Sequence, residues 1–264
     1  GEIKIGGMAG DQQSALIGQC CFNSGEAKCT FGTGAFLIIN TGDKKIDSRS
    51  RLLSTIAYRF KDKITYGLEG SVFVAGSSIQ WLRDELGFFK NASDTESLVS
   101  SRDKTSNVLV VPAFTGLGAP HWDPEARGAI FGITRATGVK EITAATLESI
   151  AFQTRDLIEA SVIDGADIKE LRVDGGMVAN DWFNKRLSSL LGMKILKPKF
   201  LETTALGAAY LAGISSGLVD DVNHLQNTIL ADEEISPIES EKVLLDIKYR
   251  NWLKAVEAIK TIKD

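Results

Sequence analysis

The first segment of the chain that could do chemistry is Gly10-Asp11-Gln12-Gln13, a carboxylate followed by two amides. Apolar residues at helical spacing follow, so this segment lies at the start of a helix expected over residues 12–22. A carboxylate there could act as a general base, and the amides could hydrogen-bond hydroxyl groups. The conservative interpretation is that Asp11 caps the helix by accepting its backbone N–H groups. The two roles are compatible.

A second candidate is Phe31-Gly32-Thr33-Gly34-Ala35-Phe36, a threonine between two glycines at an expected strand-to-strand turn. Without a Cβ on either side, backbone N–H groups and the hydroxyl of Thr33 can approach phosphate oxygens closely. The alternative is an ordinary hairpin, because glycines are common in tight turns for conformational reasons alone.

The third candidate is Asp174-Gly175-Gly176, which continues to Asn180 and lies between an expected strand and an expected helix. Open α/β sheets bind ligands at such turns, where glycine lets the backbone approach a planar ring. An ordinary strand-to-helix turn is the alternative. The segment does not match the G-x-G-x-x-G fingerprint, and the sequence contains no G-x-x-x-x-G-K-[ST] motif, which excludes a P-loop kinase.

Composition removes several other classes of function. The 264 residues include 30 Lys plus Arg and 34 Asp plus Glu, and this net charge of −4 gives no electrostatic case for binding nucleic acid or an anionic membrane. The sequence shows no apolar segment of membrane-spanning length, so membrane insertion is not expected. Three cysteines without C-x-x-C spacing fit reduced thiols and a cytoplasmic location. Two histidines are too few for a His-rich zinc site and make a Ser/His relay unfavourable.

The order of expected elements predicts an α/β fold in one domain, with a mixed parallel and antiparallel sheet flanked by helices. The charged segment 91–106 is expected to be a surface excursion. Strands are expected within residues 28–40 and at 54–60, 64–68, 108–111, 171–174 and 194–196, and helices from residue 76 and at 142–163, 181–191, 205–213 and 239–260.

In this order the motifs closely resemble the glycerol kinases of the FGGY carbohydrate kinase family. Besides the three segments above, the resemblance rests on Gly76-Ser77-Ser78-Ile79-Gln80-Trp81-Leu82-Arg83-Asp84, on the loop from Pro112 to Pro124 and on residues 128–148. It covers essentially the whole chain but only the C-terminal half of those enzymes. It implies an actin-like, ribonuclease-H-like fold, with residues 1–264 as the C-terminal, nucleotide-binding domain and the N-terminal domain absent.

The resemblance also implies ATP-dependent phosphorylation of glycerol to glycerol 3-phosphate. In that scheme Asp11 is the base that accepts the proton of the attacking hydroxyl and is a Mg²⁺ ligand. Gln12 hydrogen-bonds the polyol, and Phe36 packs against its carbons. The residues expected to bind ATP or ADP are Thr33 at the phosphates, Gly76 and Gln80 along the cleft, and Gly176 and Asn180 at the adenosine end.

Two other hypotheses stay open at this stage: a noncatalytic nucleotide-binding or assembly module, and a kinase for another polyol or ketose. The resemblance also implies that a preceding domain supplies an Asp-x-Gly-Thr phosphate loop, an Arg-Glu pair and aromatic residues for glycerol, and nothing like them occurs in this sequence. The sequence leaves regulation and assembly into a homo-oligomer open.

The isolated chain is therefore expected to bind ATP or ADP weakly and glycerol hardly at all, with negligible turnover. In-line phosphoryl transfer depends on positioning both substrates, which is worth roughly 7–11 kcal/mol and cannot come from one wall of a cleft. A coupled assay of ADP formation checks this, and turnover near that of an ordinary kinase would contradict it.

Overall fold

The computed structural model describes residues 2–60, 62–102, 106–222, 225 and 233–262. Its strands are β1 (Glu26–Phe31), β2 (Ala35–Gly42), β3 (Leu53–Phe60), β4 (Lys63–Val72), β5 (Leu109–Val111), β6 (Ala129–Phe131), β7 (Glu170–Asp174), β8 (Ile195–Lys197) and β9 (Glu233–Ile235). Its helices are α1 (Asp11–Gly18), α2 (Gly76–Asp84), α3 (Asp94–Ser100), α4 (Val139–Ile163), the 3₁₀ helix η1 (Gly176–Ala179), α5 (Asp181–Leu191), α6 (Thr203–Ser216) and α8 (Glu239–Thr261).

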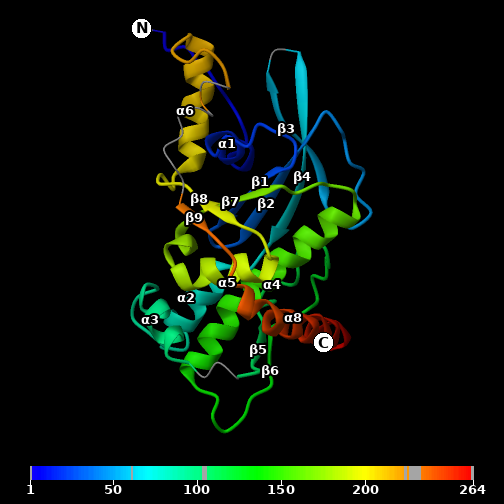
Figure 1. The fold of residues 1–264 in the computed structure, drawn as a ribbon, viewed down its shortest axis with the longest axis vertical. Helices are drawn as coiled ribbons and strands as arrows, with labels where there is room; N and C mark the ends of the chain where they lie inside the picture. Colours follow the sequence, from blue (N-terminus) through cyan, green and yellow to red (C-terminus); the bar gives the residue numbers. More distant parts are fainter. Residues whose placement is uncertain (1, 61, 103–105, 223–224, 226–232, 263–264) are drawn as a thin grey trace.

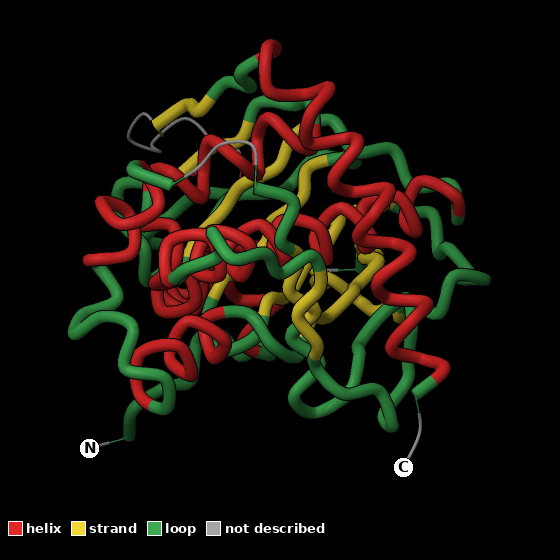
Figure 2. Tube along the Cα trace, turned by 90° about the horizontal axis from the view of Figure 1, so that it is seen from below, coloured by secondary structure: helices red, strands yellow, loops and turns green. Residues whose placement is uncertain are grey.

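A seven-stranded mixed sheet in the order β3-β4-β2-β1-β7-β8-β9 forms the centre of the fold. The first four strands make the expected antiparallel meander. Strands β1, β7 and β8 run parallel, and β9 closes the edge in the antiparallel direction. Helices lie on both sides of the strands (Figures 1 and 2), so the expected mixed α/β sheet with flanking helices is confirmed.

One face of the sheet is covered by α1, which in turn packs on α6 (Figure 1). Leu16 and Cys21 pack here against Ile38 and Ala57 of the sheet. The backbones of α1 and α6 approach so closely that a Cβ at Gly207 would overlap the backbone of Ser14. The small residues of α6 therefore allow a close contact between the two helices.

The main core lies on the other face, under α4. A buried ionic cluster links the helices that cover this core. Lys248 of α8 donates to Glu148 of α4 over 2.9 Å, and Arg102 and Arg186 lie 3.6 and 3.5 Å from the same carboxylate. All four side chains are buried, so each charge depends on its partners in the cluster.

Several expectations need correction. The first helix ends at Gly18 rather than at residue 22, because Cys20 has a φ of 52° that breaks the helix; Cys20 and Cys21 are buried but lie beyond the helix end. The segment 91–106 is not merely a surface excursion, since it contains α3 with Thr95 and Val99 buried; residues 103–105 lie outside the described part. The strand at 108–111 pairs with β6 in a separate two-stranded sheet.

Within the described ranges, no helix combines the length and the apolar character needed to cross a bilayer.

Replacing Gly207 with alanine tests the contact between α1 and α6. In an exposed helix interior this change would stabilise by up to about 1 kcal/mol. Here we expect the opposite sign, with a loss of roughly 1–3 kcal/mol, because the new methyl group would displace the backbone of α1. Urea unfolding measures the change, with Ser215→Ala on the exposed side of the same helix as control. A stabilised Gly207→Ala variant would contradict this packing.

Candidate functional site

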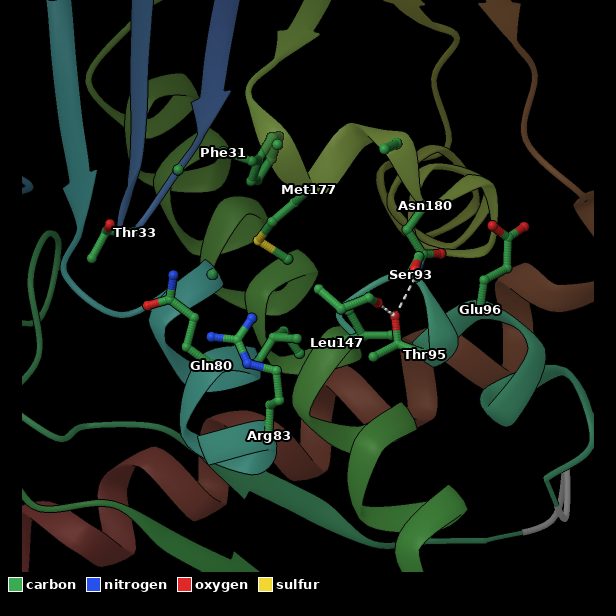
Figure 3. A pocket seen from close by; sticks show the side chains of 16 residues that line it. Phe31, Thr33, Gln80, Arg83, Ser93, Thr95, Glu96, Leu147, Met177 and Asn180 are labelled. Atoms are coloured by element: carbon green, nitrogen blue, oxygen red, sulfur yellow. Dashed lines mark hydrogen bonds between the residues drawn. The ribbon is translucent and has the colours of Figure 1, made fainter. Parts of the chain in front are cut away.

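A cavity of about 440 Å³ opens at the carboxyl ends of β1 and β7. Its walls come from the β1–β2 turn, α2, α3, α4 and η1 (Figure 3). All five residues that the sequence analysis expected to bind nucleotide line it: Thr33, Gly76, Gln80, Gly176 and Asn180. They come from segments up to 147 residues apart in the chain (33 to 180), and the fold brings them to one place. Their binding role stays a prediction.

Backbone hydrogen bonds hold the β1–β2 turn against the start of α2. The backbone N–H of Gly76 donates to the carbonyl of Gly32 over 2.9 Å, and the N–H groups of Ala75 and Ser77 donate to the carbonyl of Thr33 over 2.9 and 3.1 Å. A Cβ at Gly76 would lie 2.6 Å from the Gly32 carbonyl oxygen, so this contact requires glycine. The expected hairpin is confirmed, with the Thr33 side chain exposed at its tip.

The two neighbouring glycines after β7 play different structural roles. Gly175 has a φ of 90°, and a Cβ on it would overlap the backbone of Phe31, so it lets β7 turn closely past the end of β1. Gly176 has no heavy atom within 4 Å of its Cβ position and faces the cavity. The open space beside Gly176 is thus available to a ligand.

Asn180 joins three elements. Its Oδ1 accepts from the backbone N–H of Phe183 over 2.9 Å, which caps α5, and its Nδ2 donates to Thr95 Oγ1 of α3 over 3.1 Å (Figure 3). A side chain held at both ends keeps one orientation. Asn180 therefore fixes the position of α3 relative to the turn after β7.

The sequence analysis missed much of the cavity lining. Figure 3 shows Arg83, Met177, Thr95 and Glu96 around the same space. Arg83 could have been found, because it follows Gly76 and Gln80 at helical spacing on one side of α2. The α3 residues carry no such signal, since their place in the wall depends on how α3 packs. The other residues that the prediction did not include are Phe31, Gly32, Ile79, Ala92, Ser93, Leu147 and Ala179.

The remaining predicted residues, Asp11, Gln12 and Phe36, do not line this cavity. They belong to the α1 face of the sheet. Phe36 of β2 lies opposite Thr30 of β1, one residue before the cavity-lining Phe31. Phe36 therefore lies close to the β1–β2 turn on the face of the sheet opposite Phe31, and α1, which carries Asp11 and Gln12, covers that same face.

Asp11 does not occupy the N-cap position of α1, although its carboxylate accepts one backbone N–H of the first turn, as the conservative interpretation expected. Gly10 occupies the N-cap position, and Asp11 is the first helical residue. Its exposed carboxylate accepts from the backbone N–H of Gln12 over 2.8 Å through Oδ1 and from Gln12 Nε2 over 3.4 Å through Oδ2. Each carboxylate oxygen keeps a second lone pair, so Asp11 can still accept a proton from a hydroxyl group.

Buried and partly buried charged side chains lie beside Gln12. Lys28 is fully buried in β1 and donates to Gln12 Oε1 and, over 2.9 Å, to Thr30 Oγ1. Burial lowers the pKa of Lys28, and the nearby carboxylate of Asp174 is the strongest influence in the opposite direction. Burial raises the pKa of Glu69, which Lys28 opposes. Asp174 itself accepts from Gln19 over 2.7 Å and from Thr203.

The described residues contain no group of three or more His, Cys, Asp or Glu side chains arranged to hold a metal ion. Asp11 offers an exposed carboxylate in this region. One carboxylate suits an ion such as Mg²⁺, which takes one or two protein ligands and completes its shell with phosphate oxygens and water.

Comparison with known families defines the class of protein. Residues 27–216, more than half of the chain, match the C-terminal domain of the FGGY family of carbohydrate kinases. The chain belongs to this family. The gluconate kinase of Lactobacillus acidophilus, 23% identical with a TM-score of 0.85 over 97% of this chain and 51% of that one, shows the same fold.

Within that family the similarity is to glycerol kinases. The glycerol kinase of Marinomonas sp. is 51% identical over 98% of this chain and 52% of the relative. The crystal structure of Plasmodium falciparum glycerol kinase with ADP has a TM-score of 0.88 and 39% identity, over 98% of this chain and 51% of that one. The chain thus spans about half the length of these relatives, and the expected resemblance and actin-like kinase fold are confirmed.

The two glycines after β7 give a paired test of the cavity. Gly176→Ala should leave folding intact but weaken ADP binding by roughly tenfold, about 1.4 kcal/mol, because its methyl group enters the open space. Gly175→Ala should instead destabilise the fold, since it would overlap Phe31 and has a positive φ. Thermal unfolding and titration with ADP measure both. Unchanged ADP affinity in Gly176→Ala would contradict a ligand site here.

Proposed function

We propose that the chain is the half of an ATP-dependent glycerol kinase that carries the catalytic base and the nucleotide site. The supporting observation is the convergence of five separately predicted residues on one cavity at the carboxyl ends of β1 and β7. The similarity to glycerol kinases over almost the whole chain, one of them solved with ADP, supports the choice of substrates. Such a protein would act in the cytoplasm, where ATP is available.

In the proposed reaction, ATP binds with its adenosine end near Gly176 and Asn180 and its phosphates toward Thr33. Asp11 accepts the proton of a glycerol hydroxyl as the oxygen forms a bond to the γ-phosphorus. The bond between that phosphorus and the β–γ bridging oxygen breaks, and ADP leaves. Mg²⁺, when bound at Asp11, would neutralise charge on the phosphates.

Gln12 and Phe36 would orient the polyol in this scheme. The amide of Gln12 hydrogen-bonds hydroxyl groups, and the half-buried ring of Phe36 offers an apolar surface to the carbon chain. Because the chain spans about half of its relatives, we propose that a further N-terminal domain supplies the opposing wall and the remaining contacts to glycerol and phosphate. Closure of the two halves would then exclude water from the reaction.

Joining this chain to the N-terminal half of the Marinomonas glycerol kinase tests the proposal. We call this hybrid the assembled kinase, and it should phosphorylate glycerol. Asp11→Asn should lower its kcat by roughly 10²–10⁴-fold, because the amide cannot accept the proton. Its thermal stability should stay unchanged, since the Asp11 side chain is exposed and the Asn oxygen can still accept from Gln12.

Asp43→Asn, an exposed carboxylate in the loop after β2, is the matched control and should retain full activity. Phosphorylation of xylulose or ribulose in preference to glycerol would assign another substrate. An active Asp11→Asn enzyme would remove Asp11 as the base, and ADP binding by an inactive assembled kinase would favour a noncatalytic nucleotide-binding module.

A further inference from the structure

Lys28 is a buried cation for which the proposed reaction provides no role. Its side chain is 0% exposed, in the middle of the central strand β1 (Figure 1). A charge at such a position is costly unless its donors are satisfied and carboxylates lie nearby. Asp174 and Glu69 provide those carboxylates, since both oppose the burial that lowers the pKa of Lys28. The structure therefore maintains a cation here at a cost in desolvation.

The hydrogen bonds of Lys28 belong to a chain that leads to Asp11. Lys28 Nζ donates to Thr30 Oγ1 over 2.9 Å and to Gln12 Oε1. An ammonium group has only donors, so the oxygen of the Gln12 amide must face Lys28 and its NH₂ group must face away. That NH₂ group donates to Asp11 Oδ2 over 3.4 Å. The direction of each hydrogen bond from Thr30 to Asp11 thus follows from the identity of residue 28.

We propose that Lys28 is a positioning residue that fixes the orientation of the Gln12 amide, so that Gln12 presents its NH₂ group to the Asp11 carboxylate and to the substrate hydroxyl beside it. The inference rests on the proposed function for its kinetic consequence, but the orientation itself is a property of this chain. A rotated amide would present its oxygen to Asp11, and two acceptors would then face each other. Lys28 excludes that arrangement without touching the substrate.

A purely structural role would give a different result from a positioning role when Lys28 is replaced. Lys28→Met removes the charge and leaves an unbranched apolar side chain that is one heavy atom shorter. Because the buried carboxylate of Asp174 then loses this cation, we expect the melting temperature of the chain to fall whether Lys28 is structural or positioning. The two roles are therefore distinguished by the Gln12 amide signals and by the kinetics of the folded variant. Lys63→Met, at an exposed lysine of β4, is the matched control.

Side-chain amide NMR signals of the full 264-residue chain measure the orientation without any activity. Gln12→Ala identifies the Gln12 NH₂ pair by its loss. In the wild-type chain this pair should be shifted from the positions of solvated glutamines, and in Lys28→Met it should move to them, whereas Lys63→Met should leave it unchanged. A Gln12 pair that is unchanged in folded Lys28→Met would overturn the proposal.

If Lys28→Met does not fold, Lys28→Gln serves for the same measurement, because it keeps a polar group beside Thr30 but is shorter and uncharged.

The kinetic consequence is measured in the assembled kinase by a double-mutant cycle. Lys28→Met should lower kcat by roughly 10- to 100-fold with little change in the KM for ATP, because positioning at Asp11 is lost while the nucleotide cavity is intact. In a Gln12→Ala background the same change should have almost no further effect, since Lys28 acts through Gln12. Fully additive effects would show that Lys28 does not act through Gln12 and would overturn the proposal.

The outcomes for the two proposals are separate. A wild-type assembled kinase that does not phosphorylate glycerol would count against the proposed function, while the NMR measurement would still decide whether Lys28 orients Gln12.

Discussion

The close approach of backbone to backbone at the ends of β1 and β7 is the constraint on which the cavity depends. Gly175 passes the backbone of Phe31, and Gly76 meets the carbonyl of Gly32, at separations where any side chain would overlap. These contacts bring the β1–β2 turn, α2 and the turn after β7 around one space of about 440 Å³. Because these turns are held together by backbone hydrogen bonds, contacts within the chain fix the positions of the walls that they form.

The opposite face of β1 is organised by buried polar groups rather than by glycine. Asp174, the last residue of β7, accepts from Gln19 after α1 and from Thr203 at the start of α6, and its charge acts on Lys28. The strand that ends at the cavity thus also fixes the helix that carries Asp11. The proposed nucleotide site and the proposed base are consequently attached to the same two parallel strands, which suits a reaction in which both substrates must be aligned.

This arrangement also separates the contacts that hold the fold from those that the proposed reaction would need. Its sheet is covered on both faces, and its outer helices are linked by the buried cluster around Glu148. Folding therefore depends on contacts within the chain. Catalysis as proposed depends in addition on an opposing wall, because transfer of a phosphoryl group is accelerated mainly by positioning and by charge around the phosphates.

The sequence by itself determined the order and type of the main elements, the mixed sheet and the two glycine-bearing turns at residues 32–34 and 175–176, because hydrophobic periodicity and glycine are local signals. It also gave the five predicted cavity residues, through motifs that lie in contiguous segments. Only the tertiary structure decided that Asp11 begins α1 instead of occupying its N-cap position, that α3 forms a wall of the cavity, and that Lys28 contacts Gln12. These features depend on packing between segments distant in the chain, and such long-range contacts leave no periodic pattern in the sequence.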